Sequence, residues 1–297
     1  MLLSAYRSLC HVSCCLLFFC ATMVSIGAPA LATDAEIAEL RALEQAHQAR
    51  IGLVAVDVGS GQSLAWRGDE RFTFCSTFKA VLAACILDHS VKEPGLLSER
   101  LHWSPDKEVD WSPVTGGLGS DGMTVAELCA ASLGFSDNTA TNLLLDRLGG
   151  PQAVTDYVRK LGDTTFRLDR LEPELNVSAP GDERDTTTAL AYARTLRALL
   201  TGQALPPAQR QQLLDWMAAC TTGAGRIRAG LPDTWRLAHK TGSSGGLAHD
   251  VGLAESPDGR RILLVILTRS PDSADMARKE ALIAAAARCA LRGLGVR

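Results

Sequence analysis

A serine and a lysine stand three residues apart at the head of an apolar helical run, within RFTFCSTFKAVLAACIL at 71–87. Apolar residues recur after them at the spacing of a buried helix. Ser76 and Lys79 therefore project from one face of the first turn. A buried ammonium group is costly without partners, so the pair could be a serine nucleophile and a lysine that takes its proton. The alternative is a capping serine followed by a lysine that reaches water, and S-x-x-K alone does not decide between them.

Three further segments carry side chains suited to acyl transfer. FSDNTATN holds Ser136–Asn138 just beyond a predicted helix, and HKTGSSGG holds Lys240–Gly242 at the end of a predicted strand. Taken singly, these two triplets are typical of a turn and of a strand end. The third segment is a polar, aperiodic stretch at 167–187 that contains EPELN at 172–176. A loop of that length inside a domain is usually functional or disordered.

Strand patterns at both ends of the chain, with helical patterns between them, predict how these segments are held. Two strands are expected at 51–57 and 63–67, and three more in WRLAHKT, DVGLAES and RRILLVILTR. The fold class is therefore α/β (α+β), with a five-stranded antiparallel sheet built from both chain ends and flanked by helices. We predict an α/β domain from 33–68 and 219–297, with an inserted all-helical domain at 69–218. A site would lie in the cleft between them.

The first 32 residues are predicted to form a secretory signal peptide. One positive charge, Arg7, precedes the uncharged, mostly apolar stretch 12–26, and small residues follow at 28–32 in two A-x-A patterns. A membrane anchor is the alternative, but the apolar stretch is short for a membrane span. Cleavage near residues 30–33 would leave a periplasmic or secreted protein without a membrane attachment.

Composition argues against several other classes of protein. The chain is 46% hydrophobic and 21% charged, with a net charge of −3 and no basic patch or tail, so no nucleic-acid partner is expected. Cysteine and histidine residues lack metal-ligand spacing, so no metal site is predicted. The cysteines beyond the signal peptide are odd in number and cannot all pair within one chain. They are Cys75, Cys85, Cys129, Cys220 and Cys289.

S-x-x-K, S-D-N and K-T-G in this order resemble the signature of the penicillin-recognising serine enzymes, and EPELN resembles the omega loop of class A β-lactamases. The resemblance extends from Ile51 to the C-terminal helix. It implies a β-lactamase/DD-peptidase-like fold and a monomeric enzyme that needs no cofactor. Such an enzyme hydrolyses the β-lactam ring of penicillins and cephalosporins through a serine acyl-enzyme and so confers antibiotic resistance. The site also resembles those of members with an extended substrate spectrum.

The resemblance implies a role for each matching catalytic residue. Ser76 would attack the ring, and Lys79 would hold or relay its proton. Glu172 would activate water for deacylation and could also act in acylation. Ser136 would pass a proton to the leaving nitrogen, beside the positive charge of Lys240.

Oxyanion and substrate contacts follow from the same resemblance. The backbone N–H groups of Ser76 and Ser243 would bind the oxyanion, the first of them at a helix N-terminus. Arg226 would face the substrate carboxylate, and Trp111 would flank the cleft mouth. The full substrate-binding set is Trp111, Asn138, Asn176, Arg226, Lys240, Thr241, Gly242 and Ser243. Arg170 and Asp185 would support the structure by closing the neck of the omega loop, 167–187.

Two departures and two related families bear on this interpretation. Disulfides known in some subgroups are not expected, because Ala83 and Ser244 stand where partners of Cys129 and Cys75 would be. A penicillin-binding D-alanyl-D-alanine peptidase shares the three triplets but generally lacks EPELN. A β-lactam sensor domain stays acylated and sits behind membrane spans. Continued turnover would distinguish a β-lactamase from the sensor.

Overall fold

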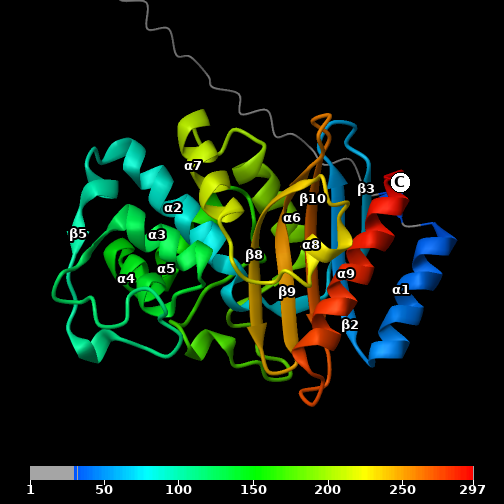
Figure 1. Ribbon diagram of the computed structural model, residues 1–297, viewed down its shortest axis with the longest axis horizontal. Coiled ribbons are helices and arrows are strands. Elements are labelled where there is room, and N and C mark those ends of the chain that lie inside the picture. Colours follow the sequence, from blue (N-terminus) through cyan, green and yellow to red (C-terminus); the bar gives the residue numbers. More distant parts are fainter. Residues whose placement is uncertain (1–29, 32, 297) are drawn as a thin grey trace, which may run out of the picture.

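Strands from the two ends of the chain pair into one sheet, as the computed structural model shows for residues 30–31 and 33–296 (Figure 1). The order is β1–β3–β2–β10–β9–β8. At its centre β2 (Arg50–Asp57) pairs antiparallel with β10 (Arg261–Arg269). Both strands are almost continuously apolar, as expected for strands covered on both faces. The other strands are β1 (Ala30–Leu31), β3 (Ser63–Trp66), β8 (Arg236–Ser244) and β9 (Leu247–Glu255).

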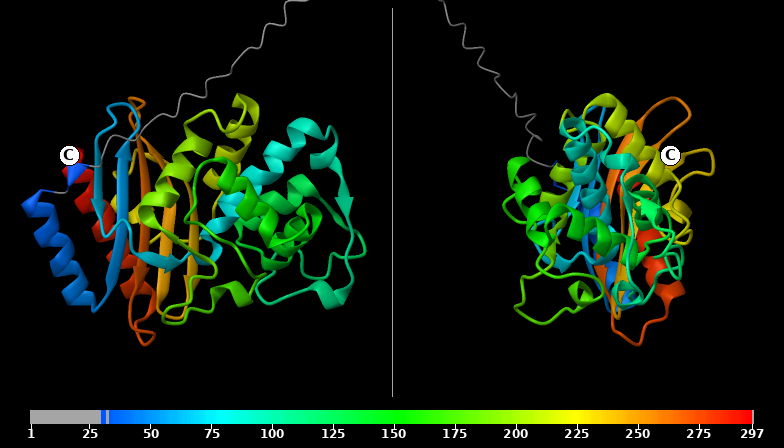
Figure 2. Two further views of the ribbon diagram at one scale, coloured as in Figure 1. Left: turned by 180° about the vertical axis from the view of Figure 1, so that it is seen from behind. Right: turned by 90° about the vertical axis from the view of Figure 1, so that its left-hand side faces the viewer.

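Each face of the sheet has its own buried core. Alternate residues of β2 enter different cores: Leu53 packs with the terminal helices, and Val54 with the opposite layer. The terminal layer comprises α1 (Asp34–His47), α8 (Ile227–Gly230) and α9 (Met276–Gly293). On the other face, α6 (Ala189–Leu200) contacts β2 and β10. Figure 2 shows the two helical layers from further directions.

A group of helices lies beyond strand β8 and surrounds α2 (Lys79–Lys92), whose first nine residues are all buried (Figure 1). Helix α2 contacts each of its neighbours, and α7 also contacts β8. These neighbours are α3 (Val125–Gly134), α4 (Asn138–Leu148), α5 (Pro151–Lys160) and α7 (Pro207–Ala218). Because α2 enters this group directly from the sheet side, its first turn lies where sheet and helices meet.

The remaining elements are short β-ladders and 3-10 helices within the connecting loops. Two small ladders pair β4 (Arg71–Thr73) with β7 (Thr186–Thr188), and β5 (Arg100–Leu101) with β6 (Met123–Thr124). The short 3-10 helices are η1 (Cys75–Phe78), η2 (Leu96–Ser98), η3 (Pro105–Lys107) and η4 (Glu174–Asn176). The β4–β7 ladder brings the start of η1 close to the end of the predicted omega loop.

The predicted five-stranded antiparallel sheet is confirmed, and the two-residue strand β1 adds to its edge in parallel with β3. The division into 33–68 with 219–297 and an inserted 69–218 stays a prediction. Within that insert, α6 and α7 pack against the sheet as well as against other helices.

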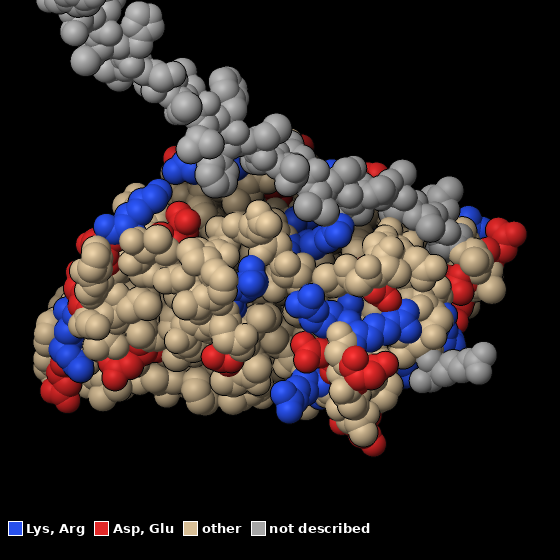
Figure 3. All heavy atoms as spheres, turned by 90° about the horizontal axis from the view of Figure 1, so that it is seen from above, with Lys and Arg blue, Asp and Glu red and all other residues tan. Residues whose placement is uncertain are grey.

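The predicted signal peptide lies outside the described residues except at 30–31. Within the part of the chain that the structure describes, no helix is both long and apolar enough to cross a membrane. Positive and negative side chains are interspersed over the face shown in Figure 3.

Candidate active site

The first turn of the α2 region places Ser76 at the edge of the sheet. Cys75, just before it, has a positive φ of 47°. Aromatic packing fixes this bend, because the Phe74 ring stacks on Phe166 with centroids 4.9 Å apart. The Tyr192 hydroxyl donates to the carbonyl of Thr77 at 2.7 Å. The sequence predicted an α-helix start here, whereas the structure has the 3-10 turn η1 leading into α2 at Lys79.

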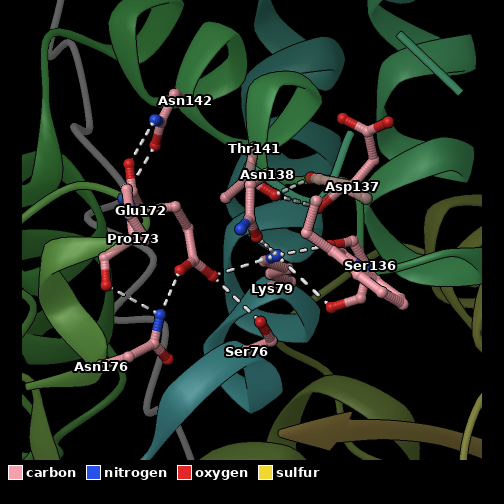
Figure 4. Close-up of polar contacts among 12 residues, drawn as sticks. Ser76, Lys79, Ser136, Asp137, Asn138, Thr141, Asn142, Glu172, Pro173 and Asn176 are labelled. Atoms are coloured by element: carbon pink, nitrogen blue, oxygen red, sulfur yellow. Dashed lines mark hydrogen bonds and ion pairs between the residues drawn. The ribbon is translucent and has the colours of Figure 1, made fainter. Parts of the chain in front are cut away.

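Lys79 and Ser76 meet on one carboxylate oxygen (Figure 4). The Ser76 hydroxyl donates to Oε1 of Glu172 at 3.0 Å, and Nζ of Lys79 lies 3.0 Å from the same atom. Lys79 is fully buried and also donates to Oδ1 of Asn138 at 2.6 Å and to the carbonyl of Ser136 at 2.9 Å. Burial lowers the pKa of Lys79, although the carboxylate of Glu172 opposes the shift. A lowered pKa favours exchange of a proton within this group.

Glu172 is clamped by two asparagine side chains (Figure 4). The Asn142 amide donates to the carbonyl of Glu172 at 2.8 Å, and its oxygen accepts from the backbone N–H of Glu172 at 3.0 Å. Asn176 donates from Nδ2 to Oε2 of Glu172 at 2.6 Å. Oδ1 of Asn176 is buried and has no partner among the described residues. Sequence reasoning missed Asn142, because an asparagine inside a helix carries no signal of its own.

The neck of the loop is closed by an ion pair at the predicted residues. Nε of Arg170 lies 2.5 Å from Oδ2 of Asp185, which is fully buried. The other oxygen of Asp185 accepts from the backbone N–H groups of Asp169 and Arg170. Arg170 also donates to the carbonyl of Val177 at 2.9 Å. These bonds join the start of the loop, at 169–170, to Val177 and to its end at Asp185.

Ser136 stands between the two lysines. Its backbone has a φ of 59°, and its hydroxyl lies 3.0 Å from Nζ of Lys240 and 3.4 Å from Nζ of Lys79. Asp137 caps α4 by accepting from the N–H of Ala140 at 2.8 Å, which explains the turn. Burial, and next the charge of Lys79, lower the pKa of Lys240 to about 7.

Strand β8 passes very close to the nucleophile. A Cβ on Gly242 would lie 3.1 Å from the backbone nitrogen of Ser76, so only glycine fits without a shift. The hydroxyl groups of Thr241 and Thr222 share a hydrogen bond of 2.6 Å. Ser243 is exposed, and its hydroxyl accepts from Arg226 at 2.7 Å.

Arg226 lies behind β8 instead of on the cleft surface. It is only 4% exposed. Its guanidinium donates to the carbonyls of Gly242 at 3.1 Å and His249 at 2.8 Å, and lies 3.1 Å from the Glu280 carboxylate. Arg226 would therefore act on a substrate carboxylate by way of its hydrogen bond to Ser243. Its predicted contact with the substrate stays a prediction.

The remaining predicted residues line the other wall. Trp111 is 65% exposed, and its indole donates to the carbonyl of Phe135 at 3.2 Å. Asn138 directs its amide nitrogen to the carbonyl of Asp110 at 2.9 Å and its oxygen to Lys79. A cavity of about 550 Å³ continues beyond Ser243 between the β8–β9 turn and the omega loop, where Asn176 and Arg269 also line it.

Comparisons with known proteins identify relatives of the whole chain. The sequence model of the Beta-lactamase enzyme family matches residues 35–294. The chain is similar to the carbapenem-hydrolyzing β-lactamase KPC of Klebsiella oxytoca, with 45% identity over 99% of each chain. It is also similar to the β-lactamase AST-1 of Nocardia asteroides, with 46% identity over 85% of this chain and 82% of that protein.

Solved structures give the same picture. A crystal structure of a β-lactamase from Desulfarculus baarsii superposes with a TM-score of 0.85 at 47% identity, covering 89% of this chain and 98% of that one. A structure of the last common ancestor of Gram-negative bacteria class A β-lactamase (GNCA4) also superposes with a TM-score of 0.85, at 46% identity, covering 88% and 99%.

Proposed function

The chain belongs to the class A β-lactamases, which hydrolyse the β-lactam ring and confer resistance, and from that premise we propose that it acts through an ester on Ser76. One observation carries the proposal: the Ser76 hydroxyl and the Lys79 ammonium both lie 3.0 Å from the same oxygen of Glu172. A serine needs such a neighbouring base to become nucleophilic.

Acylation begins when Oγ of Ser76 attacks the β-lactam carbonyl carbon. Its proton leaves to Glu172 directly or by way of Lys79, and the shared oxygen supports both routes. The oxyanion would accept from the backbone N–H groups of Ser76 and Ser243, and the close passage of β8 past Ser76 supports this assignment. The C–N bond then breaks and leaves an ester on Ser76.

Protonation of the leaving nitrogen is assigned to Ser136. Its hydroxyl contacts both Lys240 and Lys79, so a proton given to the nitrogen can be replaced from an ammonium group. Lys240 also supplies positive potential, and together with the hydroxyls of Thr241 and Ser243 it would bind the substrate carboxylate. Arg226 would strengthen that contact by donating to Ser243.

Deacylation is assigned to a water between Glu172 and Asn176. The buried Oδ1 of Asn176, unpartnered among the described residues, can accept a hydrogen bond from that water, and Glu172 can take its other proton as the water attacks the ester. The ester bond breaks, Ser76 recovers its proton, and the opened product leaves. Trp111 and Asn138 would contact the substrate side chain at the opposite wall.

Penicillins and cephalosporins are the proposed substrates, and a comparison of kcat/KM across penicillins, oxyimino-cephalosporins and carbapenems would define the spectrum. We further propose export after cleavage near residues 30–33 and action as a monomer without cofactor. N-terminal sequencing of the exported protein and its mass in solution test these two points.

The decisive experiment follows the covalent adduct by intact mass. Glu172→Ala mixed with a penicillin should accumulate an adduct on Ser76, because loss of a general base typically slows a step by about 10²–10⁴-fold. Lys79 remains to assist acylation. Glu174→Ala is the matched control: this exposed carboxylate lies two residues away, and its variant should turn over as the wild type does.

Ser76→Ala should form no adduct. A wild type that stays acylated as long as Glu172→Ala would contradict hydrolysis and favour a sensor or a penicillin-binding protein. Rapid release of the adduct from Glu172→Ala would remove Glu172 from the deacylation step.

A further inference from the structure

The segment that joins α7 to α8 packs against β8 at Thr241. The hydroxyl of Thr222 lies 2.6 Å from the hydroxyl of Thr241. Gly223 follows with a φ of 75°, and a Cβ there would lie 2.5 Å from Cγ2 of Thr241, so only glycine fits without a shift. One residue therefore bonds the hydroxyl of Thr241, and the next leaves room for its methyl group. Together they fix a side chain that is only 5% exposed.

Other hydrogen bonds hold this segment in place without the Thr222 hydroxyl. Thr221 donates to the carbonyl of Gly134, the last residue of α3, from its backbone N–H and from its hydroxyl, both at 2.9 Å. The backbone N–H of Arg226 donates to the carbonyl of Gly223 at 2.9 Å. Removal of the Thr222 hydroxyl should therefore leave the segment where it is.

The proton directions in the hydroxyl pair decide what Thr241 can do. A hydroxyl has one proton to donate and two lone pairs. Among the described residues, Thr222 is the only hydrogen-bond partner of the Thr241 hydroxyl. If Thr241 donates its proton to an anion, its oxygen presents a lone pair to Thr222. Two oxygens 2.6 Å apart without a proton between them would repel, so Thr222 must then donate to Thr241, although the sulfur of Cys220 also lies 3.3 Å from its hydroxyl.

This anion is the substrate carboxylate, and the inference rests on the proposed function at that point. Thr241 follows Lys240, whose Nζ donates to the carbonyl of Thr241 at 2.8 Å, and both residues were assigned to the carboxylate together with Ser243. A hydroxyl contributes to such a contact only when its proton points at the anion, which makes it a charge-assisted hydrogen bond. A donor behind the hydroxyl keeps the proton in that direction and strengthens the bond.

We propose that Thr222 is a positioning residue, which holds the proton of Thr241 toward the substrate carboxylate and so contributes to selectivity for β-lactams that carry this anion. Thr222 acts through Thr241 and does not itself bind the substrate. Without the Thr222 hydroxyl, the Thr241 hydroxyl can turn away from the anion. Ser76 and Glu172 keep their contacts, so the variant should bind the anion less tightly and still complete the reaction once the substrate is bound.

The test compares steady-state hydrolysis of a chromogenic cephalosporin with that of its carboxylate methyl ester. Thr222→Val keeps the shape of the side chain and removes its hydroxyl. For the acid it should lower kcat/KM about three- to tenfold, through a higher KM with kcat within about twofold of the wild type. For the ester, which carries no anion at this position, kcat/KM should stay within about twofold. Thr222→Ser retains the hydroxyl and should restore hydrolysis of the acid.

Thr221→Val is the matched control. It removes the neighbouring hydroxyl, which bonds Gly134 and not Thr241, while the backbone bond to Gly134 remains. Its kcat/KM should stay within about twofold of the wild type for both substrates. Urea unfolding of each variant checks the fold, and Thr222→Ala provides the same comparison if Thr222→Val does not fold.

A double-mutant cycle tests whether Thr222 acts through Thr241. Thr241→Val should lower kcat/KM for the acid about ten- to a hundredfold, because a hydrogen bond to a charged group is lost. Adding Thr222→Val to Thr241→Val should change this value by less than about twofold, since the group that Thr222 positions is already absent.

Three outcomes would overturn the role of Thr222 alone. They are wild-type kcat/KM of Thr222→Val for the acid, an equal loss for the acid and the ester, and an undiminished effect of Thr222→Val in the Thr241→Val background. Wild-type kcat/KM of Thr241→Val for the acid would reject both this role and the assignment of Thr241 to the carboxylate. Hydrolysis through Ser76 is judged separately, by the adduct on Glu172→Ala.

Discussion

Gly242→Ala probes the close passage of β8 over the nucleophile. The added Cβ would lie 2.9 Å from the carbonyl oxygen of Phe74, 3.0 Å from Cβ of Cys75 and 3.1 Å from the backbone nitrogen of Ser76. Backbone and Cβ atoms in a tight turn cannot rotate away as the end of a flexible side chain can. The strand and the turn must therefore separate by a few tenths of an ångström.

This separation acts on both proposed oxyanion donors, the N–H groups of Ser76 and Ser243. Complete loss of one such donor costs about 3–4 kcal/mol of transition-state stabilisation. A partial displacement of the pair should cost about 2–3 kcal/mol, which lowers kcat/KM roughly 30- to 160-fold. Overpacking should also lower the free energy of unfolding by about 1–3 kcal/mol.

The assay is hydrolysis of a chromogenic cephalosporin, together with urea unfolding. Gly68→Ala is the matched control, because a Cβ there would meet Leu190 at 3.5 Å and Val54 at 3.7 Å, which are ordinary contacts. It should leave kcat/KM within about twofold of the wild type. If Gly242→Ala retained wild-type kcat/KM and stability, the close approach would not constrain the oxyanion site and the reasoning would be refuted.

Four further outcomes are expected. Arg226→Ala should lower kcat/KM by roughly ten- to a hundredfold in steady-state assays, through its bond to Ser243. It should also unfold at lower urea concentration, because the guanidinium serves two backbone carbonyls as well. Since the pKa of Lys240 is lowered to about 7, kcat/KM should fall as the pH rises through that value, and Lys240→Arg, which keeps its charge, should remove this alkaline fall. Asp185→Asn should weaken the neck ion pair and increase deuterium exchange in the omega loop at 172–176, with slower deacylation by intact mass; unchanged exchange would contradict that role. Alkylation of the exported, denatured and unreduced protein should label all five remaining cysteines, and a disulfide-linked peptide pair would reject this.

Local patterns were sufficient to predict much of the fold. The apolar runs that became β2 and β10 predicted a sheet from both chain ends, because a continuous apolar strand requires cover on both faces. Residues three apart on a helix share a face, so Ser76 and Lys79 could be paired from spacing alone. Both now contact Glu172, which only the family resemblance connected with them.

Other features depend on packing between segments that are distant in the sequence, so no local sequence pattern predicts them. Asn142 clamps Glu172 only because the omega loop lies against α4. The substrate contact of Arg226 stays a prediction, whereas its burial behind β8 depends on how α8 and α9 cover the sheet and had no signal in the sequence.

The pairing of β2 with β10 also sets the order in which the molecule can be assembled during synthesis. Asp57 pairs with Ile262, so most of the chain lies between partners at the centre of the sheet. Contacts this remote in sequence form late, because a large loop must close before any pairing energy is gained. The strand that carries Lys240 pairs only with β9, which in turn requires β10. A nascent chain released before its last strands therefore lacks the strand that passes Ser76, so acylating activity should first arise after the ribosome has finished β10.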